Sequence, residues 1–345
     1  MSDLLCRERW ATMTEIDLPR VREALLAARD LSRAADAPQR AGDSTRGRQL
    51  PQSNQVRALA TEKLAQLGFD NATLERALAA ERAESHRHLD KLKADAVAES
   101  PARAQSLQRL VDARRAALGG VVGLWPPATQ YLAIDSPVEI WATDGVNLES
   151  TTIEPYKSRT QFRLDASLYE HFPGAYSIGW EYEFVHFYFL WKNPESVSAV
   201  VAVNPYLILN GFCSAQSQGG WFFGGKGELT LDPTLDLVQT WTQPLSSAAP
   251  QSGETWNALD LIADSTGFHT DDQTAYDVLF RGFLLSYQQE IVPPAQYLII
   301  DVSLRLGSYV ENAEVSADFA TGEFYVMSPL VDLAIVYPAI GEVLA

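Results

Sequence analysis

The stretch WEYEFVHFYFLW, residues 180–191, decides the fold of this chain of 345 residues. Its first half alternates aromatic residues with Glu181 and Glu183, which is typical of a strand with one face in solvent. From Val185 onward the stretch is apolar on both faces, as in a strand enclosed between two layers. A strand that begins at the surface and then enters an interior predicts a two-sheet sandwich.

The same period-two pattern continues on both sides of this stretch, from about residue 121 to the C-terminus. About ten to twelve strands are expected there. Turn signals separate them, among them Asn204-Pro205, Asp232-Pro233 and Pro293-Pro294. No helical period and no internal repeat interrupts the series. We therefore expect residues 121–345 to form an all-β antiparallel sandwich that is jelly-roll-like.

The first 120 residues follow a helical pattern instead. A helix is expected within 1–35, over 17–35, and a flexible linker rich in Pro, Gly and Arg over 36–55. Further helices are expected over 55–67, about 71–98 and 100–118, because Ser100 can cap a helix whose first position is Pro101. Two long helices that meet there predict a helical hairpin or stalk over 56–120. The fold class is thus α+β by segments.

The apolar stripes of these helices are narrow, with Leu89, Leu92 and Ala96 on one helix and Leu107 and Val111 on the next. Each stripe is wide enough for one partner. That partner is either the second domain of the same chain or another copy of the chain, and both remain open. The stripe width leads us to expect a homo-oligomer or a protein partner.

Charge divides the chain at the same boundary. The whole chain has 27 basic and 44 acidic residues and a net charge of −17. Beyond residue 120 only 7 basic residues remain against 27 acidic ones. A surface so acidic repels phosphate, so nucleic acid is excluded as a partner of the β part. A basic-leaning helical part and an acidic sandwich predict head-to-tail attraction between copies.

Several features bear on the compartment. Cys6 and Cys213 stand alone, so a disulfide framework is not expected. The N-terminus lacks the pattern of a secretory signal, and the apolar runs are too short to be a transmembrane segment. These features favour a cytoplasmic protein, with release by lysis or by a dedicated export route left open.

Sequence motifs for catalysis, nucleotides or cofactors are absent. The chain contains no Gly-x-Ser-x-Gly elbow, and His86 and His88 are two residues apart where helical metal ligands are three or four apart. We therefore expect no cofactor and favour a protein without enzymatic activity. Two alternatives stay open: Glu181 and Glu183 as a carboxylate pair lining a cleft, and Asp264, Asp271 and Asp272 as calcium ligands from a loop.

The string Trp221-Phe222-Phe223 is flanked by glycines on both sides. One interpretation is a tight corner or bulge in a strand. The other is an exposed aromatic binding patch. A helical segment followed by a sandwich is similar in plan to virion, phage-tail and toxin subunits and to multi-domain lectins, although no diagnostic motif identifies a family.

Three functional hypotheses follow. The first is a structural or interaction protein that self-associates or docks through its helical part and presents an acidic sandwich as a packing or binding surface. The second is a sandwich that binds or hydrolyses carbohydrate. The third is a toxin-like protein active at membranes, against which the polar character of the helices counts.

Overall fold

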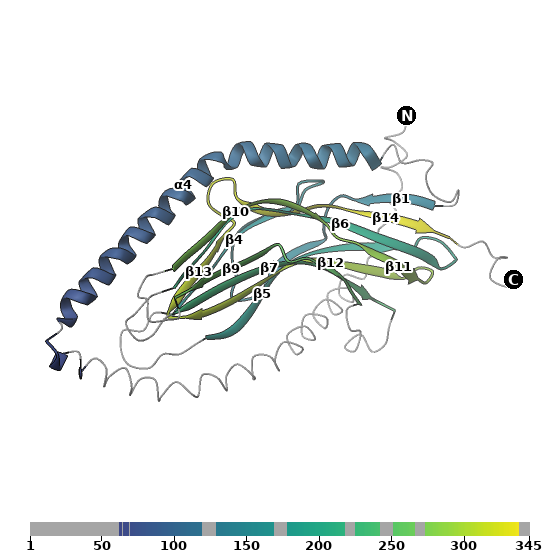
Figure 1. The fold of residues 1–345 in the computed structure, drawn as a ribbon. Coiled ribbons are helices and arrows are strands. Elements are labelled where there is room, and N and C mark those ends of the chain that lie inside the picture. Colours follow the sequence, from purple (N-terminus) through teal and green to yellow (C-terminus); the bar gives the residue numbers. More distant parts are fainter. Residues whose placement is uncertain are drawn as a thin grey trace.

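The computed structural model describes residues 62–63, 65–68, 70–118, 129–168, 178–217, 225–241, 251–265 and 273–337. One long helix, α4 (Asn71–Leu118), precedes two antiparallel sheets that form a sandwich (Figure 1). The predicted α+β arrangement by segments is therefore confirmed. The expected helix over 17–35 and the linker over 36–55 lie outside the described residues.

Sheet A has eight strands in the order β1-β14-β4-β13-β6-β10, with β3 beside β4 and β11 beside β6. Their bounds are β1 Thr129–Ile134, β3 Asn147–Thr152, β4 Arg159–Leu168, β6 Ala199–Ser217, β10 Gln273–Leu284, β11 Tyr287–Val292, β13 Ala313–Asp318 and β14 Tyr325–Val336. Sheet B has six strands in the order β2-β5-β12-β7-β8, with β9 also beside β7. Their bounds are β2 Glu139–Ala142, β5 Ile178–Lys192, β7 Lys226–Gln239, β8 Gln251–Thr255, β9 Leu259–Asp264 and β12 Tyr297–Glu311.

The strand order confirms the jelly-roll-like expectation. From β4 to β7 the chain alternates between sheets A and B, and from β10 to β13 it passes A, B, A again. The neighbours are β4-β13-β6-β10 in one sheet and β5-β12-β7-β9 in the other. Two interleaved Greek keys of this kind define a jelly roll.

The core lies between the sheets, and β5 shows how the sequence places it. Val185, Phe187 and Phe189 are fully buried in the main core cluster. Their even-numbered neighbours point to the other face of sheet B, where Tyr188 and Leu190 belong to a separate cluster. The alternation predicted from residues 180–191 is confirmed, because successive side chains of a strand point to opposite faces.

Two predicted turns are wrong. Asn204-Pro205 lies within the unbroken strand β6, and Asp232-Pro233 lies within β7. Each proline stands where a neighbouring strand is replaced: β10 gives way to β11 beside Pro205, and β9 gives way to β8 beside Pro233. Proline cannot donate to the ladder, so it is tolerated where the ladder is interrupted.

The hairpin expected over 56–120 is also wrong for the described residues. α4 continues through Pro101 and bends in its middle, so its two arms lie along sheet A instead of folding onto each other (Figure 1). A proline inside a helix leaves the carbonyl four residues earlier without its usual donor. The Ser100 hydroxyl donates to that carbonyl, Val97 O, at 2.8 Å, which compensates for the missing bond.

Both arms of α4 pack on the outer face of sheet A. On the first arm, Leu89 and Ala96 are buried against Phe212 and Phe324. On the second arm, Leu107 and Val111 are buried in a cluster with Ile208, Tyr325, Met327 and Leu330. The narrow helical stripe is therefore covered by the sandwich of the same chain, which settles the alternative that the sequence left open for these residues.

The second arm offers a matched test of this packing. Leu107 is 1% exposed, whereas Leu110 on the same arm is 53% exposed. We expect Leu107→Ala to lower the free energy of unfolding by about 2–5 kcal/mol, because it leaves a cavity under the helix. Leu110→Ala should change the free energy of unfolding by less than about 0.5 kcal/mol. Urea unfolding followed by circular dichroism measures both, and equal effects would contradict the docking of this arm.

Candidate functional site

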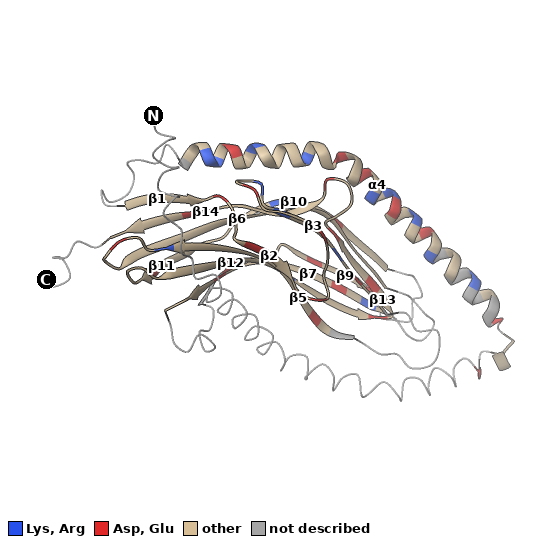
Figure 2. Cartoon of the chain, turned by 180° about the vertical axis from the view of Figure 1, so that it is seen from behind, with Lys and Arg blue, Asp and Glu red and all other residues tan. Residues whose placement is uncertain are grey.

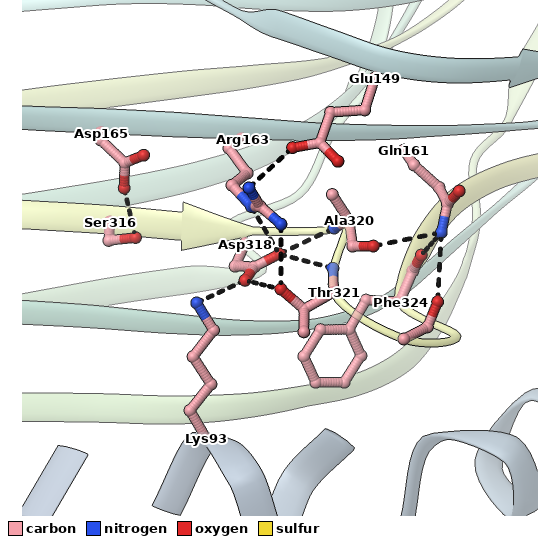
Figure 3. Close-up of polar contacts among 11 residues, drawn as sticks. Lys93, Glu149, Gln161, Arg163, Asp165, Ser316, Asp318, Ala320, Thr321 and Phe324 are labelled. Carbon is pink, nitrogen blue, oxygen red and sulfur yellow. Dashed lines mark hydrogen bonds and ion pairs between the residues drawn. The ribbon is translucent and has the colours of Figure 1, made fainter. Parts of the chain in front are cut away.

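The junction between α4 and the sandwich contains a group of polar contacts centred on Asp318 (Figure 3). Asp318 ends β13 and is 1% exposed. Its carboxylate accepts hydrogen bonds from the backbone amides of Ala320 and Thr321 at 2.8 and 2.9 Å. Lys93 reaches it from α4, with 2.5 Å between Nζ and Oδ2 (Figure 3). The carboxylate thus joins the helix to the turn that follows β13.

Arg163 on β4 extends this group. Its guanidinium lies 3.6 Å from Asp318 Oδ1, bonds Glu149 Oε1 at 2.9 Å and donates to the Thr321 hydroxyl at 3.2 Å. Burial alone would raise the pKa of Asp318, but the hydrogen bonds from Lys93, Thr321 and the two amides outweigh burial and lower that pKa to about 2. An ionised carboxylate with so many donors is a structural anchor, because it is neither a base nor open to a ligand.

A second charged contact fixes the other arm. Arg114 donates two hydrogen bonds to Asp332 Oδ2, at 3.1 and 2.8 Å. Burial raises the pKa of Asp332, and the nearby Arg114 opposes that rise. Both arms of α4 therefore place a basic side chain on a buried aspartate of sheet A.

The outer face of sheet B holds a buried histidine–aspartate pair. His186 Nδ1 lies 3.0 Å from both carboxylate oxygens of Asp301, and Trp141 stacks on the imidazole at 4.5 Å between ring centroids. His186 is therefore a buried histidine held by a hydrogen bond to Asp301. Ser303 stands opposite His186 in the ladder, yet no Ser303–His186 hydrogen bond completes a catalytic triad among the described residues.

Further along this face is a group of aromatic rings with cations beside them. Trp180 stacks on Tyr182 at 5.9 Å and meets Tyr309 at 6.1 Å. Arg305 lies over the Tyr182 ring and Lys226 over the Tyr309 ring. Aromatic rings beside charged hydrogen-bond donors suit a ligand that has an apolar face and polar groups around its rim.

Exposed apolar residues gather on the outer face of sheet A. Tyr276, Phe280 and Leu284 lie four positions apart on one side of β10 and are 44%, 39% and 41% exposed. Ile291 on β11 continues the row at 60% exposed. We call these four residues the apolar strip. They lie on the face that α4 packs against, since Val278 between them contacts the helix cluster.

The structure describes only some of the site residues predicted from the sequence. Glu181 and Glu183 do share one side of β5, and Glu183 lies against Gly145, where an added Cβ would be 2.3 Å from its Oε1. The two carboxylates lie on a single strand, whereas glycoside hydrolysis needs carboxylates on opposite sides of the scissile bond.

Other predicted residues fall partly beyond the described part of the chain. Trp221, Phe222, Phe223, Asp271 and Asp272 lie outside it, so both the aromatic patch and the calcium site stay predictions. Asp264 is exposed at the end of β9. Within the described ranges no three His, Cys, Asp or Glu side chains gather in a way that could hold a metal ion.

Two further findings concern the reactivity of Cys213 and the apolar character of the helix. Cys213 is a free, buried thiol whose pKa is raised by burial and by the charges of Asp277 and Asp318, which makes it a poor nucleophile. Among the residues that the structure describes, no helix has the length and apolar character needed to span a membrane.

The sequence-based interpretation missed the apolar strip and the Asp318 anchor. The strip had a signal, because Tyr276, Val278 and Phe280 alternate with Asp277 and Arg281. That alternation predicts a strand with two different faces but not which face stays uncovered. The Asp318 anchor had no local signal, since its partners come from α4, β4 and the following turn.

Comparison with known proteins identifies no relatives by sequence: no family model and no curated protein matches the chain. An aminopeptidase from a marine sediment Thaumarchaeota archaeon is similar with a TM-score of 0.23 and 11% identity, covering 61% of this chain and 38% of that one. TmCBM61 in complex with β-1,4-galactotriose is similar with a TM-score of 0.14 and 11% identity, covering 44% of this chain and 80% of that one. A structure of infectious bursal disease virus, Gx strain, is similar with a TM-score of 0.15 and 11% identity, covering 64% of this chain and 41% of that one. Similarities this weak assign neither family nor function.

The Asp318 anchor predicts a pH dependence of stability. The pKa of Asp318 is about 2 in the folded chain against 3.8 for an ordinary aspartate, a difference worth roughly 2 kcal/mol. Because the folded pKa is the lower one, this contribution is complete above about pH 4 and is lost as the pH falls toward 2.

Asp318→Asn should therefore lower the free energy of unfolding at pH 7 and flatten its dependence on pH between 4 and 2. Asp165→Asn is the matched control, because Asp165 is an exposed carboxylate that accepts a bond from the Ser316 hydroxyl at 2.7 Å. Urea titrations of the wild type and both variants at several pH values give the comparison. If the free energy of unfolding of Asp318→Asn fell between pH 4 and 2 as steeply as that of the wild type, Asp318 would not be the anchor.

Proposed function

We propose that this chain is a structural protein that self-associates through its sandwich and has no enzymatic activity. The observation that carries the proposal is the apolar strip, whose large exposed side chains lie on the outer face of sheet A along β10 and β11, which both pair with β6. Contiguous exposed apolar residues on a soluble protein are characteristic of association surfaces. The function of α4 is then to brace sheet A, since its apolar stripe is already buried.

The polar groups support the same proposal. The carboxylates of Asp318, Asp332 and Asp232 bond to Lys93, Arg114 and Arg305. Each of these charged hydrogen bonds joins two different elements of the fold, which is a structural role. The acidic surface of the sandwich keeps copies soluble until apolar contact brings them together.

Carbohydrate binding is a second candidate, favoured by the rings around Trp180. Aromatic faces stack on the apolar faces of sugars, while Arg305 and Lys226 add charged donors at the rim. The face concerned belongs to sheet B, opposite to the apolar strip, so both activities are compatible in one molecule.

The self-association proposal predicts a mass above that of a monomer. Size-exclusion chromatography with light scattering, run from low to high protein concentration at low and high salt, should show association. Phe280→Asp should shift it to monomer by placing a charge in the apolar strip. Ile262→Asp is the control, because Ile262 is 47% exposed on β9 of sheet B. A strict monomer at high concentration in both salts would remove the proposal.

The carbohydrate candidate predicts binding on a glycan array. Trp180→Ala should abolish a hit confirmed by titration calorimetry, because stacking on the ring is lost, while Trp256→Ala should leave it intact. Trp256 is 46% exposed and lies between β8 and β9. If a confirmed glycan is also cleaved, Glu181→Gln combined with Glu183→Gln tests the hydrolytic version. Absence of any binding to the array removes this candidate.

A further inference from the structure

We propose that two copies of this chain pair through the open edge of β10, antiparallel and about a two-fold axis at Leu279, so that sheet A continues from one copy into the other. This inference rests on the proposed function and names its partner and register. It is argued from four observations: the length of the edge, the direction of its backbone groups, its charges and the room beside α4.

β10 is the longest strand at an edge of the described sheets. It has 12 residues, whereas β1, β3, β9 and β11 have 6 each, β8 has 5 and β2 has 4. Within the described chain β10 pairs only with β6, so its other side is unpaired. A long, flat, apolar edge is a template for a strand from another chain.

The free backbone groups of β10 follow from the ladder with β6. Leu285 N donates to Pro205 O at 3.0 Å, and the β10–β6 register runs without a break from Gln273 to Leu284. Because backbone groups alternate in direction along a strand, odd-numbered residues bond toward β6. The N–H and C=O groups of Tyr276, Val278, Phe280 and the other even-numbered residues therefore point to the open edge.

The charges select one register. Asp277 and Arg281 lie at the edge with side chains 31% and 52% exposed. Two-fold pairing centred on Asp277 or on Arg281 would place like charges opposite each other. Pairing centred on Leu279 instead places Arg281 opposite Asp277 of the second copy, twice, and bonds even-numbered residues to even-numbered residues.

The same register joins the two apolar strips. Phe280 then stands opposite Val278 of the second copy, and Tyr276 opposite its Gly282. Tyr206 already lies over Gly282, where an added Cβ would be 2.2 Å from its Oη. The joined surface is thus an aromatic and aliphatic band between the two helices. Arg281 is one of only 7 basic residues beyond residue 120, so its position at this edge offsets the repulsion between acidic copies.

The helices leave room for this pairing. α4 packs over β6 through Phe212 and Ile208. The two β6 strands of the paired copies would be three strand spacings apart, roughly 14 Å. Two helices of about 10 Å diameter fit side by side at that separation, with the apolar strips between them.

Charge reversal in the full-length chain tests the register. Asp277→Arg alone and Arg281→Asp alone should each weaken association roughly tenfold or more in light scattering, because like charges then face each other across the edge. An equimolar mixture of the two variants should restore association, since the edge of one variant is then wholly basic and the edge of the other wholly acidic. Arg281 also bonds Asp277 of its own chain at 3.1 Å, and in each variant alone this internal pair becomes repulsive. Rescue by mixing therefore reports only contact between copies.

Hydrogen exchange gives a test without substitutions. At high protein concentration the amides of Tyr276, Val278 and Phe280 of the wild type should exchange more slowly than in dilute protein. For the charge-reversal variants, thermal unfolding confirms that each one is folded. Association that persists in both single variants, or a mixture that fails to restore it, overturns the β10 pairing and leaves the proposed function standing. A strict monomer of the wild type overturns both.

Discussion

The rest of the structure depends on how the bend of α4 fits the turn between β13 and β14. Pro101 frees the carbonyl of Val97, and Ser100 satisfies it at 2.8 Å. The same hydroxyl accepts the backbone N–H of Glu323 at 3.2 Å. Gly322 has φ of +64°, and an added Cβ would lie 2.9 Å from Val97. The turn needs glycine both for its conformation and for the closeness of the helix. One bend thus sets the direction of two helical arms.

Those arms are required because sheet A is apolar on both faces. Its inner face closes the main core, and its outer face presents Ile208, Phe212 and Leu330, which would be exposed without the helix. Charge is distributed unevenly between the two parts: Figure 2 shows Lys and Arg positions interspersed with Asp and Glu along α4, and chiefly Asp and Glu positions on the strands. Lys93 and Arg114 meet their aspartates within one chain. The attraction expected between copies therefore operates, for these residues, inside the molecule.

Sequence patterns predicted what depends on neighbouring residues and failed where distant residues decide. Alternation in residues 180–191 was enough to place Phe187 inside and His186 on the opposite face. The sequences around Pro205 and Pro233 resemble turns locally. These prolines stay within strands because one neighbouring strand ends and another begins beside each of them. Ser100-Pro101 is a good start for a helix and an equally good bend, and the sandwich turn decides between them. The candidate site was missed for the same reason, since exposure of Phe280 depends on where α4 stops covering sheet A.

The edge strands of the two sheets differ in length and in charge, and the difference bears on function. The edge of sheet B beside β7 is divided into β8 and β9, and the exposed residues of β9 include Asp260 and Asp264. Short length and inserted charge are the usual protections of an edge against other chains. β10 has neither a proline nor a lysine, and its two charges are of opposite sign four residues apart. Among the edge strands of the described sheets, the longest one is thus apolar and has charges that match across a two-fold axis, as a specific, closed contact between two copies requires.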